Sequence, residues 1–296
     1  MTKKTLYLVL GLIFLIFFLI FFKLVKTSNL LVDEGNSQGT FYLVKKFKNE
    51  SNWFNSLLPS QKKLERGDVV VYYDPSVSDP ELKDKDKLVG RLIGLPGDAL
   101  TLIDKKLIIN NKVIDEWYKL FFKYRVTFSD NNTASLIDEF KDNKNILLWE
   151  EIVAGKAYEF IAAPETAKEL ENCDGIINIR MLTMQPNEYV MDYFPKVPNV
   201  LWNKDHYGPV YIPQKDVTLA LTTKNIGIYK RIIDVFEDHK IIIDLSKIEI
   251  DGVSVNSYTF EKDYYFVLND NRDSGKDSRY YGFIPSDHII GKAIKK

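Results

Sequence analysis

The sequence predicts a mainly β chain with an inserted subdomain and one N-terminal transmembrane helix. Three observations predict this fold class. An uncharged apolar run extends from Leu6 to Phe22. Beyond Asn29, short runs of β-branched and aromatic residues alternate with turn residues, as is typical of β-strands. Between residues 116 and 205, a stretch rich in aromatics and in helix-like segments interrupts these strands.

The N-terminal apolar run reads LYLVLGLIFLIFFLIFF. With its neighbours it reaches the length of about 17–25 residues that a membrane-spanning helix needs. A cleavable signal peptide has a shorter apolar core and a small-x-small cleavage site, which the following residues KLVKTSNLL lack. A buried core helix is the alternative, but the run has no polar face. We therefore predict that residues 1–26 are an uncleaved anchor in the lipid bilayer; two lysines on each side leave its orientation open.

Several strands and turns can be predicted from the next segments. Asp68–Tyr73 is a β-branched and aromatic run between turn residues, which predicts a strand. Lys106–Ile114 predicts a hairpin, because Asn110 and Asn111 tolerate the positive φ angles of a tight turn. Lys247–Val255 predicts a second hairpin of the same design, with Asp251-Gly252 at its turn.

The two hairpins follow similar segments, Gly90–Ile93 and Lys230–Ile233, which form a weak internal echo in the sequence but not a solenoid repeat. Between the two, Pro164 is expected to open a helix that Gly175 stops. We divide the chain into four parts: an anchor (1–26), a first part of a β-rich core (31–115), an insertion (116–205) and a second part of the core (206–296).

The composition excludes several classes of function. Forty Lys and Arg against 41 Asp and Glu leave a net charge of −1, which argues against a nucleic-acid partner. The single cysteine, Cys173, can form neither an internal disulfide nor a zinc site built from thiolates. Three histidines leave little material for a histidine-rich metal site. We expect neither a metal nor another cofactor.

The most informative segment is Asn269–Gly282, which follows an apolar strand and carries three Asp and two Arg. Such a run of charges is usually a solvated loop. Here Tyr280, Tyr281 and Phe283 follow, so part of the loop should lie against a core. Charged side chains held there must pair, and arginine pairs bidentately with carboxylates. We predict an ion pair between Asp277 and Arg279.

This segment resembles the last signature box of bacterial type I signal peptidases, G-D-N-R-x-x-S-x-D-S-R-x-x-G. Arg66–Tyr72 resembles a second box, and Gly90–Asp98 resembles a third, K-R-x-I-G-x-P-G-D. Asp205–Pro213 and Ser257–Phe260 are similar to the long-insertion form of Bacteroidetes. The signature positions that this chain retains are Arg91, Asp98, Asp270, Arg272, Asp277, Ser278 and Arg279.

The resemblance implies an anchor in the bacterial inner membrane and a β-rich catalytic domain on its outer, periplasmic side. Members of the family cut signal peptides from exported proteins with a serine nucleophile and a lysine general base, without a cofactor. A serine hydroxyl needs a base to take its proton. A lysine can be that base only where burial leaves it neutral.

The chain departs from the family at the catalytic positions. The family lysine precedes the residue that matches Arg91, and this position is Gly90. The family serine that hydrogen-bonds the lysine corresponds to Gly275, and the leading glycine of the last box corresponds to Asn269. An ungapped match places Asn36 at the nucleophile. A shift of one residue recovers Ser37, but the loop that follows is shortened.

Two functions follow from these departures. The first is a catalytically impaired signal peptidase that binds signal-peptide segments or an active signal-peptidase paralogue. The alternative is an active signal peptidase that uses Ser37 with a non-standard lysine. Lys230 is the nearest candidate, because its segment echoes the missing box, but Asp-Val-Phe-Glu follows instead of Gly-Leu-Pro-Gly-Asp. Lys87 would reach the site only if its strand slipped in register, and an odd slip reverses the facing of side chains.

Overall fold

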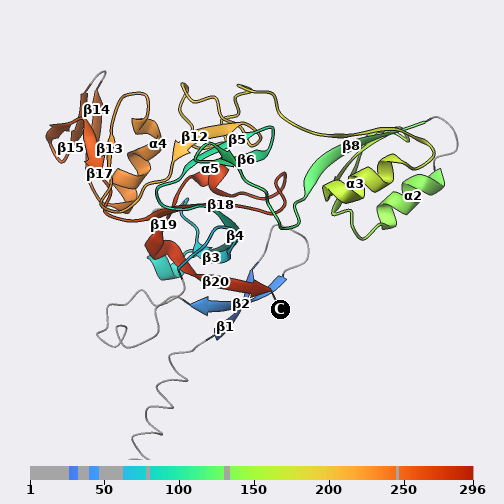
Figure 1. The fold of residues 1–296 in the computed structure, drawn as a ribbon, viewed down its shortest axis with the longest axis horizontal. Helices are drawn as coiled ribbons and strands as arrows, with labels where there is room; N and C mark the ends of the chain where they lie inside the picture. Colours follow the sequence, from blue (N-terminus) through green and yellow to red (C-terminus); the bar gives the residue numbers. More distant parts are fainter. Residues whose placement is uncertain are drawn as a thin grey trace, which may run out of the picture.

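The computed structural model describes residues 27–32, 40–46, 63–77, 81–129, 134–244 and 247–295. The predicted anchor and both nucleophile candidates, Asn36 and Ser37, lie outside these residues. Within the described ranges, no helix has the length and apolar character needed to cross a membrane. The predicted mainly β class is confirmed, since most of the elements are strands (Figure 1).

The largest sheet has seven strands and joins distant parts of the chain. In spatial order they are β1 (Thr27–Val32), β2 (Thr40–Lys46), β20 (Ile289–Lys295), β3 (Val69–Tyr73), β4 (Lys87–Gly94), β18 (Tyr264–Leu268) and β19 (Ile284–Pro285). Neighbouring strands are antiparallel. The strand predicted at Asp68–Tyr73 is therefore confirmed within one residue, as β3. Short 3-10 turns, η2 (Leu82–Asp84) and η4 (Ser286–His288), precede β4 and β20.

A second sheet contains the first predicted hairpin. Its strands are, in spatial order, β12 (Tyr207–Tyr211), β5 (Ala99–Ile103), β6 (Lys106–Ile109) and β7 (Lys112–Val113). Asn110 and Asn111 connect β6 to β7 with φ angles of 51° and 63°. This prediction is confirmed, because asparagine tolerates the left-handed region that such a turn requires.

The second predicted hairpin is also confirmed. β14 (Ile241–Asp244), β15 (Lys247–Ile250) and β16 (Val253–Val255) form a three-stranded sheet. Asp251 and Gly252 form the turn between β15 and β16, with φ angles of 52° and 81°. A further pair, β13 (Thr218–Ala220) and β17 (Ser257–Thr259), lies beside this sheet (Figure 1).

The sequence similarity between Gly90–Ile93 and Lys230–Ile233 does not extend to their structure. The second segment spans the end of α4 (Ile226–Arg231) and the start of a π-helix, η3 (Ile232–Phe236). The buried apolar residues here recur at helical spacing rather than in alternation: Ile226, Tyr229, Ile232, Ile233 and Phe236. Burial of this helical face outweighs the local similarity to β4.

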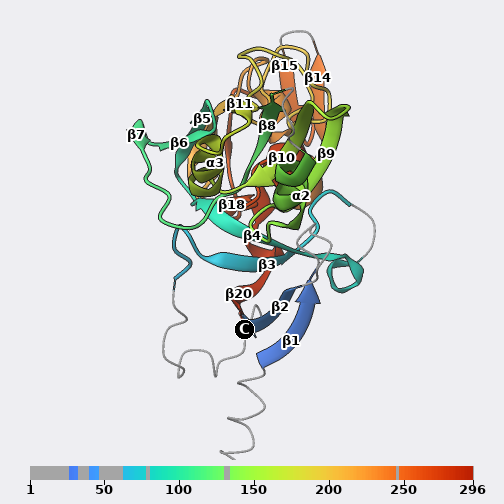
Figure 2. The same ribbon diagram turned by 90° about the vertical axis from the view of Figure 1, so that its right-hand side faces the viewer.

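Within the range predicted as an insertion, the chain forms a separate four-stranded sheet. Its spatial order is β11 (Ile176–Met181), β8 (Phe122–Phe128), β10 (Ala157–Ala162) and β9 (Leu148–Val153), and it carries α2 (Ala134–Asp142) and α3 (Pro164–Glu171). The helix predicted at Pro164 is confirmed, with proline in its first turn. The sheet has an apolar cluster of its own around Phe128, Phe140 and Phe160. Figures 1 and 2 show it to one side of the larger sheet.

One small core positions the candidate site. Between β3, β4 and β18, the buried side chains of Val70, Tyr72, Leu92 and Val267 form one apolar cluster with Tyr281. Tyr281 belongs to a short helix, α5 (Ser278–Tyr281), that packs against β18. The last signature segment is thereby held against the strand that carries Gly90.

Candidate active site

The predicted ion pair between Asp277 and Arg279 is confirmed. The Arg279 Nη2 and Nε atoms lie 2.7 and 2.9 Å from the Asp277 carboxylate, and neither side chain is more than 2% exposed. Asp277 is also the N-cap of α5, because its carboxylate accepts from the Arg279 backbone N–H at 3.0 Å. Burial acts to lower the pKa of Arg279, but the Asp277 carboxylate outweighs it and raises that pKa above its ordinary value.

Further hydrogen bonds fix the helix to its surroundings. The Val267 backbone N–H donates to the Ser278 Oγ at 3.0 Å, which ties α5 to β18. Arg279 donates to the backbone carbonyl oxygens of Lys204 and Arg272 at 3.0 and 2.8 Å. Arg279 therefore joins the last signature segment to the chain that precedes β12.

Arg91 and Asp270 connect β4 to the same segment. The Arg91 Nε and Nη2 atoms lie 2.6 and 2.5 Å from the two oxygens of Asp270, which is a bidentate pair. Arg91 also donates to the Gly67 carbonyl oxygen at 2.6 Å, and its guanidinium lies 4.0 Å from the centre of the Tyr118 ring. One side chain thus joins three signature segments that are far apart in the sequence.

The remaining signature residues are also in ion pairs. Asp98 pairs with Arg66 at 2.9 Å, and Arg272 pairs with Glu116, whose side chain is 8% exposed. The retained signature residues thus hold segments of the chain together, which is a structural role.

Gly90 lies in the middle of the large sheet, opposite Val70 on β3. A Cβ atom at this position would lie 3.2 Å from the Cβ and Cγ2 atoms of Val267 and 3.4 Å from the Tyr72 hydroxyl. That hydroxyl is hydrogen-bonded to the hydroxyl of Tyr281. Burial raises the pKa of both tyrosines above the ordinary value, so both stay protonated at physiological pH. The space beside Gly90 is therefore occupied by Val267 and by the Tyr72 hydroxyl, which the Tyr281 hydroxyl holds in place.

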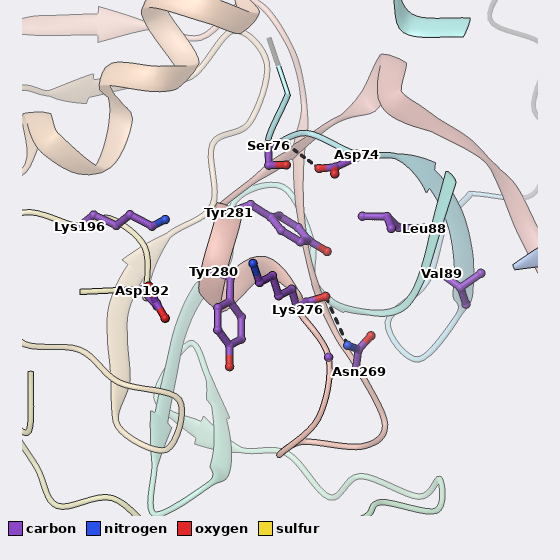
Figure 3. A pocket seen from close by; sticks show the side chains of 11 residues that line it. Asp74, Ser76, Leu88, Val89, Asp192, Lys196, Asn269, Lys276, Tyr280 and Tyr281 are labelled. Atoms are coloured by element: carbon purple, nitrogen blue, oxygen red, sulfur yellow. Dashed lines mark hydrogen bonds between the residues drawn. The ribbon is translucent and has the colours of Figure 1, made fainter. Parts of the chain in front are cut away.

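A cleft of about 450 Å³ lies beside this position (Figure 3). Three parts of the chain form its walls: the hairpin of β3 and β4, the irregular segment between β11 and β12, and the loop and helix that follow β18. The lining residues are Asp74, Ser76, Leu88, Val89, Asp192, Lys196, Asn269, Gly275, Lys276, Tyr280 and Tyr281.

Gly275, the residue that the sequence comparison above aligns with the family serine, lines this cleft. Its φ is 76°, and an added Cβ would lie 2.8 Å from the Asn269 Nδ2 atom. A serine would be strained in this backbone conformation. Asn269, expected from the sequence to replace a glycine of the box, thus lies next to Gly275.

The candidate substitute bases do not meet at the cleft. Lys230 is exposed on α4, Lys87 is exposed at the start of β4, and neither lines the cleft. The sequence analysis missed two lysines that do line it, Lys196 and Lys276. Lys276 could have been suspected from its place directly after Gly275. Lys196 had no such signal, because the fold alone brings its segment to the cleft.

A buried lysine lies elsewhere in the molecule. Lys105, in the turn between β5 and β6, is 7% exposed, and its ammonium group lies 2.7 Å from Asp205 and 2.8 Å from Asp273. Burial lowers the pKa of Lys105, while the two carboxylates oppose this effect. Lys105 does not line the cleft. In the described part of the chain, no group of three His, Cys, Asp or Glu residues could hold a metal ion.

The chain is similar in sequence to known signal peptidases. The family model described as signal peptidase, peptidase S26, matches residues 2–158 and 247–295. Signal peptidase I of Buchnera aphidicola subsp. Baizongia pistaciae is 26% identical over 261 residues, which cover 86% of this chain and 63% of that protein. Signal peptidase I of Aquifex aeolicus is 48% identical over 44 residues, 15% of this chain and 17% of that protein. A solved signal peptidase I from Enterococcus faecalis V583 is 17% identical, covers 79% of this chain and 98% of its own, and has a TM-score of 0.28.

Proposed function

The chain belongs to the signal peptidase family, peptidase S26, and from this premise we propose that it binds signal-peptide segments but cleaves them poorly or not at all. It spans 63% of the length of the Buchnera relative, so activity, substrates and partners are inferred from its own residues. Peptide hydrolysis and peptide binding place different requirements on the residues of the site.

The observation that carries the proposal is the environment of Gly90. A serine nucleophile requires a neighbouring base, and glycine has no side chain to supply one. The Tyr72 hydroxyl lies 3.4 Å from the point where a lysine side chain would begin, and it is hydrogen-bonded to the Tyr281 hydroxyl. The raised pKa values of both tyrosines keep them protonated. A protonated phenol cannot accept the serine proton.

Other lysines are poor replacements. A lysine acts as a general base only where burial favours its neutral form. Lys196, Lys230 and Lys276 are exposed to solvent. Lys105 is buried, but its ammonium group donates to two carboxylates, and it lies outside the cleft.

Peptide binding has less demanding requirements, and two features of the chain support it. A cleft of about 450 Å³ is within the usual size of ligand sites, about 300–1,000 Å³. It has apolar surface from Leu88, Val89 and Tyr281 and polar groups on the opposite walls. The half-buried ion pair of Arg91 with Asp270 and the buried pair of Arg279 with Asp277 support the loop that forms one wall. The scaffold of the site is thus retained although its base is missing.

The proposal includes a location and partners. The apolar run from Leu6 to Phe22 would anchor the chain in the inner membrane, with the remaining domain on the outer side. There it would meet signal-peptide segments of exported proteins, which reach the same face of the membrane. An active signal peptidase paralogue is a second proposed partner.

Cleavage and binding are tested together. The full-length chain in detergent is mixed with a preprotein that carries an efficient signal peptide, with an active type I signal peptidase as the positive control. We expect binding of the intact preprotein and no cleavage. Cleavage at the usual small-x-small site that is abolished by Ser37→Ala would overturn the proposal.

The alternative function is an active peptidase that uses Ser37 with a non-standard lysine. One observation favours it: Lys276 lines the cleft directly after the position of the family serine. If this alternative holds, Lys276→Gln abolishes cleavage as fully as Ser37→Ala does. Lys230→Gln, on exposed α4, is the matched control and should leave cleavage unchanged.

A further inference from the structure

Two lysines enter the cleft from opposite walls. Lys276 belongs to the loop that follows β18, and Lys196 belongs to the irregular segment between β11 and β12. Figure 3 shows both ammonium groups directed into the space between these walls. Two positive charges therefore border one cleft.

Both backbones are fixed by local contacts. Near Lys196, the Phe194 backbone N–H donates to the Arg279 carbonyl oxygen at 2.8 Å, and the Phe194 ring lies 5.7 Å from that of Phe283. Lys276 immediately precedes Asp277, which is completely buried in its pair with Arg279. The two lysines are thus presented by anchored segments of the chain.

Neither ammonium group has a partner within the described part of the chain. No hydrogen bond or ion pair there involves the Nζ atom of Lys196 or Lys276. Nearby Lys204, in contrast, lies 3.1 Å from a carboxylate oxygen of Asp205 and also pairs with Asp273. Two carboxylates line the cleft, Asp74 and Asp192, and neither forms an ion pair with these lysines. The two ammonium groups remain available to a ligand.

Their place relative to the missing catalytic groups indicates which ligand. Lys276 follows Gly275, and Gly90 lies behind the hydroxyl pair of Tyr72 and Tyr281, so the lysines border the region where the family cuts its substrate. Hydrolysis of a peptide bond there by an active peptidase adds water and leaves a carboxylate on the signal peptide and an amine on the mature protein. An uncleaved chain has a neutral amide at the same point.

We propose that the cleft captures the free C-terminal carboxylate of a cleaved signal peptide between Lys196 and Lys276. This inference rests on the proposed peptide binding and goes beyond it, because it makes the product of cleavage the preferred ligand. A carboxylate accepts charge-assisted hydrogen bonds from ammonium groups, whereas a neutral amide gains much less from them. The chain would then remove spent signal peptides from the membrane rather than produce them.

Three synthetic peptides test the proposal against the full-length protein in detergent, by fluorescence anisotropy. All share the C-terminal sequence of one signal peptide. The first ends in a carboxylate, the second ends in an amide, and the third ends in an amide and carries one internal aspartate. Because exposed ion pairs contribute little, we expect only a modest preference: the carboxylate peptide should bind about fivefold more tightly than the amide peptide. This ratio should fall at high salt, which screens the charges.

Variants assign the preference to the two lysines. In Lys196→Gln combined with Lys276→Gln, the carboxylate and amide peptides should bind equally, at the affinity that the wild type has for the amide. Lys230→Gln removes one exposed positive charge outside the cleft and should keep the preference.

The outcomes separate this inference from the proposed function. Equal binding of the carboxylate and amide peptides by the wild type would overturn the inference and leave peptide binding intact. Equal binding of the carboxylate and internal-aspartate peptides would show that any carboxylate suffices, and would also overturn it. If none of the three peptides binds, the proposed function fails as well.

Discussion

Replacing Asp277 with alanine should lower the free energy of unfolding by about 3–5 kcal/mol, which is the usual cost of removing one partner from a buried ion pair. The pair is enclosed by protein: Asp277 is 0% and Arg279 is 2% exposed. Alanine would leave the guanidinium without its carboxylate in a place that water does not reach.

The hydrogen bonds of Asp277 support this magnitude. Its carboxylate accepts from the Nε and Nη2 atoms of Arg279, from the Arg279 backbone N–H at the start of α5, and from the Asn269 backbone N–H at 3.1 Å. Hydrogen bonds to charged groups contribute about 1.5–3 kcal/mol each, but bonds that share one carboxylate are not additive. A total near the middle of the buried-pair range is therefore expected.

Urea unfolding of the full-length chain in detergent, followed by circular dichroism, measures the effect. Asp138→Ala is the matched control, because it removes an aspartate whose side chain is 75% exposed and 3.9 Å from Lys141. That control should change stability by less than about 0.5 kcal/mol. A loss below about 1 kcal/mol for Asp277→Ala would refute the view that the pair holds the last signature segment in place.

Three further predictions concern other parts of the chain. Gly90→Lys with Gly275→Ser should not restore preprotein cleavage, and overpacking in the sheet should cost about 1–3 kcal/mol in urea unfolding; recovered cleavage would show that the nucleophile loop is intact. Hydrogen bonds that the His239 ring donates to the carboxylates of Asp251 and Glu261 raise the pKa of His239. The stabilising effect of His239 is therefore full below about pH 6.5 and is lost as the pH rises through the folded-state pKa. His239→Gln should remove this pH dependence, whose size stays below about 1 kcal/mol because solvent screens the pair. If the variant shows the same dependence of urea unfolding on pH as the wild type, His239 is not its source. Phe160→Ala empties a fully buried position in the inserted sheet and should cost about 3–5 kcal/mol in the same measurement; a loss below about 1 kcal/mol would mean that the cluster is loosely packed.

Local signals in the sequence were sufficient to predict several elements of the fold. The turn at Asn110 and Asn111, the turn at Asp251 and Gly252, and the helix that begins at Pro164 all depend on backbone preferences of the residues themselves. The pair of Asp277 and Arg279 is also local, because its partners are two residues apart. Such features need no knowledge of the rest of the fold.

Long-range contacts could not be predicted in the same way. The hydroxyls of Tyr72 and Tyr281 meet only because β3 and α5 pack on the same small core. Lys196 enters the cleft because the irregular segment before β12 folds back over the last signature box. The local sequence around Lys230 resembles β4, yet tertiary burial of a helical face decides its structure.

The position of β20 in the large sheet constrains the order of folding. β20 lies between β2 and β3, so the hairpin of β1 and β2 pairs with the body of the sheet only through a strand that begins at Ile289. During synthesis, β2 leaves the ribosome long before β20 exists. The edge of β2 must therefore wait, unpaired on that side, until nearly all of the residues up to β20 have been synthesised. Non-local pairings of this kind fold slowly and expose strand edges. A chaperone that shields this edge would accordingly raise the yield of folded protein.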